Sequence, residues 1–67
     1  MERAPIVLTE PLLTPAEAAA LLQVRPSWVY EAARGGRLPH MKLGKHIRFA
    51  RADLDTFLAA QRVPERP

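Results

Sequence analysis

Basic side chains are concentrated in one segment of this sequence. They are the residues whose type and spacing best indicate a binding function. Six of the ten Lys and Arg residues and none of the seven Asp and Glu residues fall between positions 34 and 51. They are Arg34, Arg37, Lys42, Lys45, Arg48 and Arg51, with His40 and His46 among them. Concentrated positive charge attracts a polyanion. We therefore expect a nucleic-acid partner, with a merely solvated surface as the alternative interpretation.

The same segment offers little for catalysis or metal binding. His40 and His46 could combine with Ser27 and Asp53 in a hydrolytic site, but a chain of 67 residues has little room for the pocket and oxyanion donors that such a site needs. Two histidines without any cysteine are too few ligands for a typical zinc site. We predict no enzyme activity, no catalytic or metal-binding residue, no cofactor and no small-molecule substrate.

The length and composition predict one small domain. It covers residues 12–62, between a flexible arm at 1–11 and a disordered tail at 63–67 that contains two prolines. The apolar run at 6–8 lies between prolines, so the arm is either disordered or a short edge strand. The lack of cysteine, of a secretory signal and of a membrane-spanning apolar run predicts a soluble cytoplasmic protein without a membrane partner.

The first part of the domain is expected to consist of two helices that are joined by a short link. Thr14 can cap a helix that has Pro15 at its first position and Glu17 closing a capping box, and this helix should end near Gln23. Leu13 should pack against Ala18. One face of this helix is expected to be apolar, and its residues are Ala18, Ala19, Leu21 and Leu22.

The second helix should begin at Pro26 and run to Arg34 before Gly35-Gly36, about three residues after the first. A link of this length is typical of helix-turn-helix units. The residues expected to face inward are Val29, Ala32, Ala33 and Gly36. The residues left on the opposite face, which a recognition helix presents to the DNA major groove, are Ser27, Tyr30, Glu31 and Arg34.

An alternating pattern follows and predicts a β-hairpin with a tight turn at Gly44-Lys45. The predicted apolar face holds Met41, Leu43, Ile47 and Phe49. The residues predicted to point elsewhere are Lys42, His46 and Arg48. A third helix should run from about Arg51 to about Arg62, with Asp53 and Asp55 in its first turns and a buried stripe of Leu54, Phe57 and Leu58.

Several of these runs, in this order and spacing, resemble the excisionase-type small DNA-binding domains, which are relatives of the DNA-binding heads of MerR-type regulators. The runs are 13–19, Val29-Tyr30, 36–39, 43–49 and Asp53-Leu54. The resemblance covers roughly residues 12–60. It implies a mainly α-helical winged helix-turn-helix whose second helix enters the major groove, while the hairpin wing touches the backbone or an adjacent minor groove.

The resemblance also implies which residues contact double-stranded DNA. On the second helix they are Ser27, Tyr30, Glu31 and Arg34, and on the wing they are Lys45, His46 and Arg48. To these we add Arg25, which could reach a phosphate from the link, and Lys42 of the hairpin. His46 can donate to phosphate when it is protonated, and Arg48 is the principal wing candidate because it sits on a short, rigid hairpin.

Three positions depart from the family pattern. Arg25 stands where relatives often carry a capping Ser. Gln23 stands where Gly is common, so we expect a non-glycine residue in a left-handed conformation at a cost of about 1 kcal/mol. Glu31 stands where relatives often carry Arg. Its carboxylate either reads the amino group of a cytosine or does not belong in the groove.

The expected role is that of an excisionase, which sets the direction of recombination, or of a small transcription regulator. The alternative is a protein-interaction module that docks an acidic partner. An integrase or recombinase, or further copies of the chain on DNA, are the candidate protein partners, and the DNA-bound protein would be associated with the nucleoid. No heptad pattern continues the third helix, so we expect a monomer in free solution that loads cooperatively on tandem sites. Trp28 is read as a core residue, with base stacking as its alternative.

Overall fold

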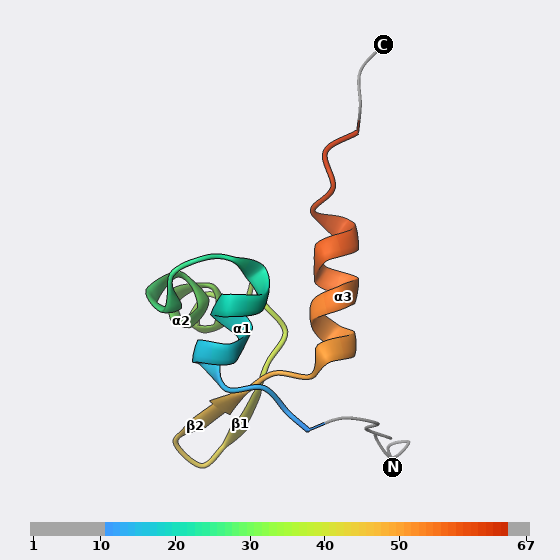
Figure 1. Ribbon diagram of the computed structural model, residues 1–67. Helices are drawn as coiled ribbons and strands as arrows, with labels where there is room; N and C mark the ends of the chain where they lie inside the picture. Colours follow the sequence, from blue (N-terminus) through green and yellow to red (C-terminus); the bar gives the residue numbers. More distant parts are fainter. Residues whose placement is uncertain (1–10, 65–67) are drawn as a thin grey trace.

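The computed structural model describes residues 11–64 and contains three helices and one hairpin. The helices are α1 (Pro15–Leu22), α2 (Pro26–Arg34) and α3 (Arg51–Ala60), and the strands are β1 (Met41–Leu43) and β2 (His46–Arg48). Helices α1 and α2 lie side by side, and the hairpin projects from the end of the molecule opposite to the end of α3 (Figure 1). This is the predicted winged helix-turn-helix. The apolar run at 6–8 and most of the predicted arm and tail lie outside the described residues.

Helix α1 begins and ends as the local sequence predicts. The Thr14 hydroxyl accepts from the Glu17 backbone N–H at 3.1 Å, and the Glu17 carboxylate accepts from the Thr14 N–H at 2.9 Å, which completes the capping box. Gln23 follows the helix with φ 60, in the left-handed region. This conformation lets the Val24 N–H donate to the Ala19 carbonyl at 3.0 Å, so the chain turns sharply into α2.

Helix α2 also keeps its predicted bounds. Pro26 occupies the first turn, and Arg25 is the N-cap without a side-chain hydrogen bond. The buried residues of α2 are Val29, Ala32 and Ala33. Gly36 was predicted to face inward, but it is exposed because the helix ends at Arg34 and Gly36 lies in the following turn with φ 76.

The hairpin has the predicted turn, but its faces differ from the prediction. Gly44 has φ 66, as a two-residue turn with glycine in its first position requires. The paired residues are Met41 with Arg48, Lys42 with Ile47, and Leu43 with His46. Since directly opposite residues share a face, Met41 and Leu43 lie with His46 and Arg48, whereas Lys42 lies with Ile47. The predicted apolar face was wrong because a two-residue turn pairs odd with even positions.

A small apolar core joins these elements, and Phe49, with 0% exposure, is its largest fully buried side chain. Leu13 and Phe49 form an isolated antiparallel bridge that fixes the start of α1 to the end of β2. The buried hydrophobic residues of this core are Ala18, Ala19, Val29, Ala32, Ala33, Leu38, Phe49 and Leu54. No polar or charged residue between 11 and 64 is buried. The side chains of the described core are therefore held by apolar contacts, while the Leu13–Phe49 bridge adds backbone hydrogen bonds.

Helix α3 contacts the core with one side of its first half. Leu54 is fully buried and Phe57 packs partly against the core, but Leu58 is 42% exposed. The predicted burial of Leu58 was wrong because the second half of α3 extends beyond α1 and α2 (Figure 1). The helix ends at Ala60, two residues earlier than predicted, and Gln61 is its C-cap. None of the helices between residues 11 and 64 has the length and apolar run needed to cross a bilayer.

Candidate nucleic-acid interface

The exposed face of α2 carries all four side chains that were predicted to face a groove. They are Ser27, Tyr30, Glu31 and Arg34. At 100° per residue these side chains lie opposite the buried face of the helix. Tyr30, which is 40% exposed, lies at one edge of this set. A helix of nine residues is about 14 Å long, and the major groove, about 12 Å wide, admits a helix.

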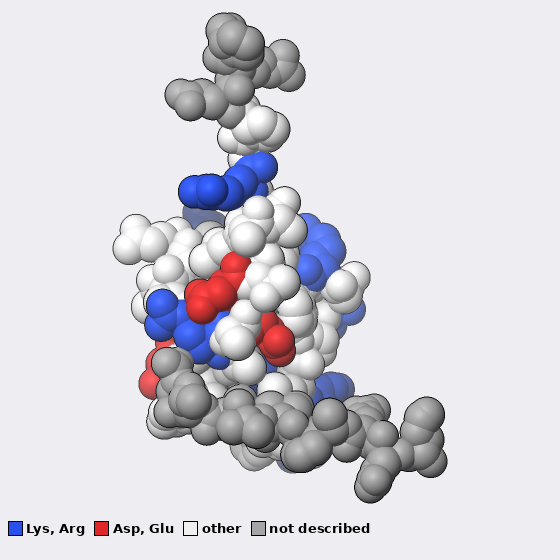
Figure 2. All heavy atoms as spheres, turned by 90° about the vertical axis from the view of Figure 1, so that its right-hand side faces the viewer, with Lys and Arg blue, Asp and Glu red and all other residues white. Residues whose placement is uncertain are grey.

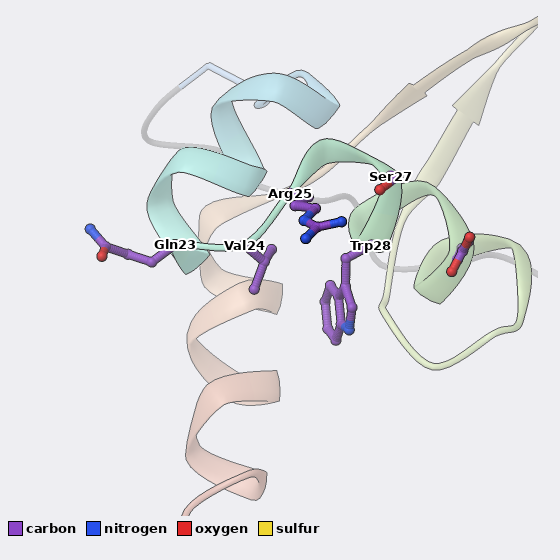
Figure 3. A pocket seen from close by; sticks show the side chains of 6 residues that line it. Gln23, Val24, Arg25, Ser27 and Trp28 are labelled. Carbon is purple, nitrogen blue, oxygen red and sulfur yellow. The ribbon is translucent and has the colours of Figure 1, made fainter.

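The turn before α2 borders an open hollow of about 710 Å³. Its lining residues are Gln23, Val24, Arg25, Ser27, Trp28 and Glu31. Val24 and Trp28 point to the same side, with Arg25 between them, while Gln23 points away (Figure 3). Trp28 packs partly against the core, in agreement with the core interpretation. Its remaining surface forms one wall of the hollow, so Trp28 links the core to the edge of the exposed helix face.

Arg37 is a candidate that the sequence reasoning counted among the cations but did not place at the site. Its guanidinium carbon lies 5.9 Å from the centroid of the Trp28 ring, within the range of a cation–π contact. Arg37 is exposed, so its N–H donors remain accessible. The contact restricts a long flexible side chain to one flank of α2. No local pattern in the sequence indicates this contact.

The hairpin presents three of its four candidate side chains to solvent. Lys42, Lys45 and His46 are exposed, and Lys45 lies in the turn after Gly44 at the tip of the hairpin. Leu43, beside His46, is 52% exposed. The tip therefore carries the Lys45 cation in the turn and the exposed Leu43 side chain at the end of β1. It projects away from the helices (Figure 1), so it can approach a polyanion.

Arg48, the principal wing candidate, has a different environment. Its side chain is partly buried, and Nη1 donates to the Ile47 carbonyl at 2.8 Å. That carbonyl belongs to the strand that continues through Phe49 to the bridge with Leu13. The guanidinium thus satisfies a backbone acceptor on β2 with one of its donors. A guanidinium has five N–H donors, which leaves others for a second partner.

The remaining polar groups are occupied or dispersed. Arg51 pairs with Asp55 at 3.4 Å on the surface of α3, and His40 shares a hydrogen bond with the Leu38 carbonyl at 3.0 Å. No group of three His, Cys, Asp or Glu residues that could hold a metal ion occurs between residues 11 and 64. On the face seen from the side of α3, acidic residues lie near the centre and Lys and Arg lie toward the margins (Figure 2). That face is therefore less suited to phosphate than the exposed cations of α2 and the hairpin.

Comparison with known families matches residues 12–62 to a family described as a helix-turn-helix domain. The chain belongs to this family. No curated protein and no solved structure matches it. The match spans both helices of the turn, the hairpin and α3, so it agrees with the resemblance to small DNA-binding domains that the sequence motifs indicated.

This helix-turn-helix domain is a DNA-binding protein, and its family is generally non-enzymatic. In helix-turn-helix proteins the second helix is the recognition helix, which corresponds to α2. The hairpin occupies the position of a wing. The helices and the hairpin of this chain therefore supply the two parts of a winged helix-turn-helix.

Proposed function

We propose that this domain binds double-stranded DNA with α2 in the major groove and the β1–β2 hairpin against the backbone or an adjacent minor groove. The observation that carries the proposal is the face of α2. Its four polar side chains are exposed together opposite a buried apolar face. A major groove can accommodate both the aromatic side chain of Tyr30 and the guanidinium of Arg34.

The contacts divide into two classes. Ser27, Tyr30, Glu31 and Arg34 face the base edges and determine sequence preference. The phosphate-contacting residues are Arg25, Lys42, Lys45, His46 and Arg48, and we add Arg37 because Trp28 restricts its side chain beside α2. Arg25 lies just before the N-terminal end of α2, where the helix dipole also favours an anion.

The role that we propose is that of an accessory factor, either an excisionase or a small transcription regulator. One domain touches few base pairs, so useful occupancy requires several copies on neighbouring sites or an integrase or recombinase beside it. We propose that the protein acts in the cytoplasm and is associated with the nucleoid when it is bound to DNA.

Fluorescence anisotropy with a labelled duplex, titrated with salt, tests DNA binding. If the five Lys and Arg phosphate contacts form, the logarithm of the affinity should fall with the logarithm of salt with a slope of about −4 to −5. An excess of random duplex should compete less well than a selected site. If the protein binds no duplex at low salt but binds an acidic polypeptide, it is a protein-interaction module instead. A duplex affinity that does not change with salt would also contradict the proposal.

A further inference from the structure

Glu31 differs from the other carboxylates of the described chain. Glu17 closes the capping box of α1, Asp55 pairs with Arg51, and Asp53 is partly buried in the first turn of α3. Glu31 is exposed, and between residues 11 and 64 it has neither an ion pair nor a side-chain hydrogen bond. The Glu31 carboxylate therefore has no close charged or hydrogen-bonding partner within the part of the chain that the structure describes.

Glu31, which has no ion pair or side-chain hydrogen bond within the described residues, lies where it could contact a ligand of α2. Glu31 lies on the same face of α2 as Ser27 and Arg34. Ser27 is about one turn closer to the N-terminus, and Arg34 is nearly one turn closer to the C-terminus. Helical side chains lean toward the N-terminus of their helix, so the carboxylate extends toward the end of α2 that contacts base edges in helix-turn-helix proteins. It also lines the hollow beside Trp28 and Arg25. Glu31 is thus the anionic acceptor on a face whose other charged member is the cation Arg34.

The chemistry of the major groove limits what such an acceptor can bind. A carboxylate is repelled by phosphates, and it meets acceptor atoms on the edges of guanine and at the oxygen of thymine. Adenine offers an amino group, but its N7 acceptor lies next to that group. Cytosine offers an amino group without a neighbouring acceptor on the same base. A carboxylate that is buried in the groove without a donor also loses its hydration without compensation.

We infer that Glu31 is a specificity-determining residue that selects cytosine at one position of the DNA site. The inference rests on the proposed docking of α2 in the major groove. Glu31 acts on preference in two ways, because it accepts a hydrogen bond from the cytosine amino group and penalises bases that offer only acceptors. The expected discrimination at that position is roughly 5- to 150-fold.

Selection of sites from a randomised duplex library by the full chain tests this inference. The wild type should enrich a C·G pair at one position. Glu31→Gln is nearly isosteric, and it should lose that preference and favour adenine, since an amide can bond both the amino group and N7 of adenine. Glu31→Ala should lose all preference at that position and keep the preferences elsewhere, while its affinity for random duplex should stay equal or rise.

Asp55→Asn is the matched control. It removes one negative charge from α3, where the side chain is well exposed, and it should leave the selected sequence unchanged. Selected sites with the same base at every position in the wild type and both Glu31 variants would overturn the inference while leaving duplex binding established. A wild type that selects no sequence or binds no duplex would overturn the proposed function itself. Circular dichroism should show the same helix content in all four proteins.

Discussion

Leu13 and Phe49 exchange two backbone hydrogen bonds, from Leu13 N to Phe49 O at 2.7 Å and from Phe49 N to Leu13 O at 2.9 Å. This bridge connects the residue before the α1 cap to the residue after β2. The Phe49 side chain is fully buried among the helices at the same point. Phe49 therefore fixes the position of the wing relative to the helix-turn-helix through both its backbone hydrogen bonds and its buried side chain.

Phe49→Ala should strongly destabilise the domain. Truncation of a buried Phe costs about 3 to 5 kcal/mol, which is a large part of the stability expected from a core of this size. Urea denaturation followed by circular dichroism measures this change. Leu43→Ala is the control on the same hairpin. Because Leu43 is 52% exposed, its loss should change stability by less than about 0.5 kcal/mol. Equal effects of the two substitutions would contradict the assignment of Phe49 to the core.

Gln23→Gly should stabilise the domain. A left-handed conformation costs a non-glycine residue about 1 to 2 kcal/mol, and the entropy of the added glycine offsets about 0.5 to 1 kcal/mol of the relief. The expected net gain is between about 0 and about 1.5 kcal/mol, and each 1 kcal/mol gained should raise Tm by roughly 4 to 8 °C. Differential scanning calorimetry gives the value. Gln61→Gly, at the α3 C-cap with φ −89, has no strain to relieve and should lower Tm.

Lys45→Ala should weaken binding to a selected site and to random duplex by the same factor, because a phosphate contact carries no sequence information. Arg34→Ala should weaken binding to the selected site more than binding to random DNA. Anisotropy titrations with both duplexes separate the two effects. A change of sequence preference in Lys45→Ala would place the turn of the hairpin against base edges instead.

Arg48→Ala should lower both DNA affinity and stability, since Arg48 also donates to the Ile47 carbonyl. Arg48→Lys keeps the charge but not the planar fork of donors, so it should recover part of the affinity. Parallel measurements of Tm and of duplex affinity in both variants provide the check. Unchanged affinity in Arg48→Ala with an intact circular dichroism spectrum would remove Arg48 from the interface.

Local chemistry predicted much of this fold, and the errors have particular causes. The bounds of α1 and α2 followed from Thr14, Glu17 and Pro26, whose effects extend over one turn. The faces of the hairpin depend instead on its register, which the two-residue turn sets, so Lys42 and Leu43 were assigned to the wrong sides.

Tertiary placement was less accessible to sequence reasoning. Periodicity placed Leu58 on the apolar stripe of α3, but the second half of this helix has no neighbouring helix to cover it (Figure 1). The contact between Arg37 and Trp28 joins α2 to the loop after it, and no local rule predicts that pairing. The face of α2 was accessible from sequence because its buried residues, Val29, Ala32 and Ala33, form a regular helical pattern.

Chemical interference on a selected duplex tests the placement of α2 most directly. Dimethyl sulfate methylates guanine N7 in the major groove and adenine N3 in the minor groove. Duplexes with methylated guanine N7 within one stretch of the site should be excluded from the bound fraction, and the same stretch should lose this effect in a Ser27→Ala, Arg34→Ala double variant. Adenine N3 methylation should interfere only beside that stretch, where the hairpin lies. Binding that is insensitive to guanine N7 methylation at every position but blocked by adenine N3 methylation would contradict the entry of α2 into the major groove.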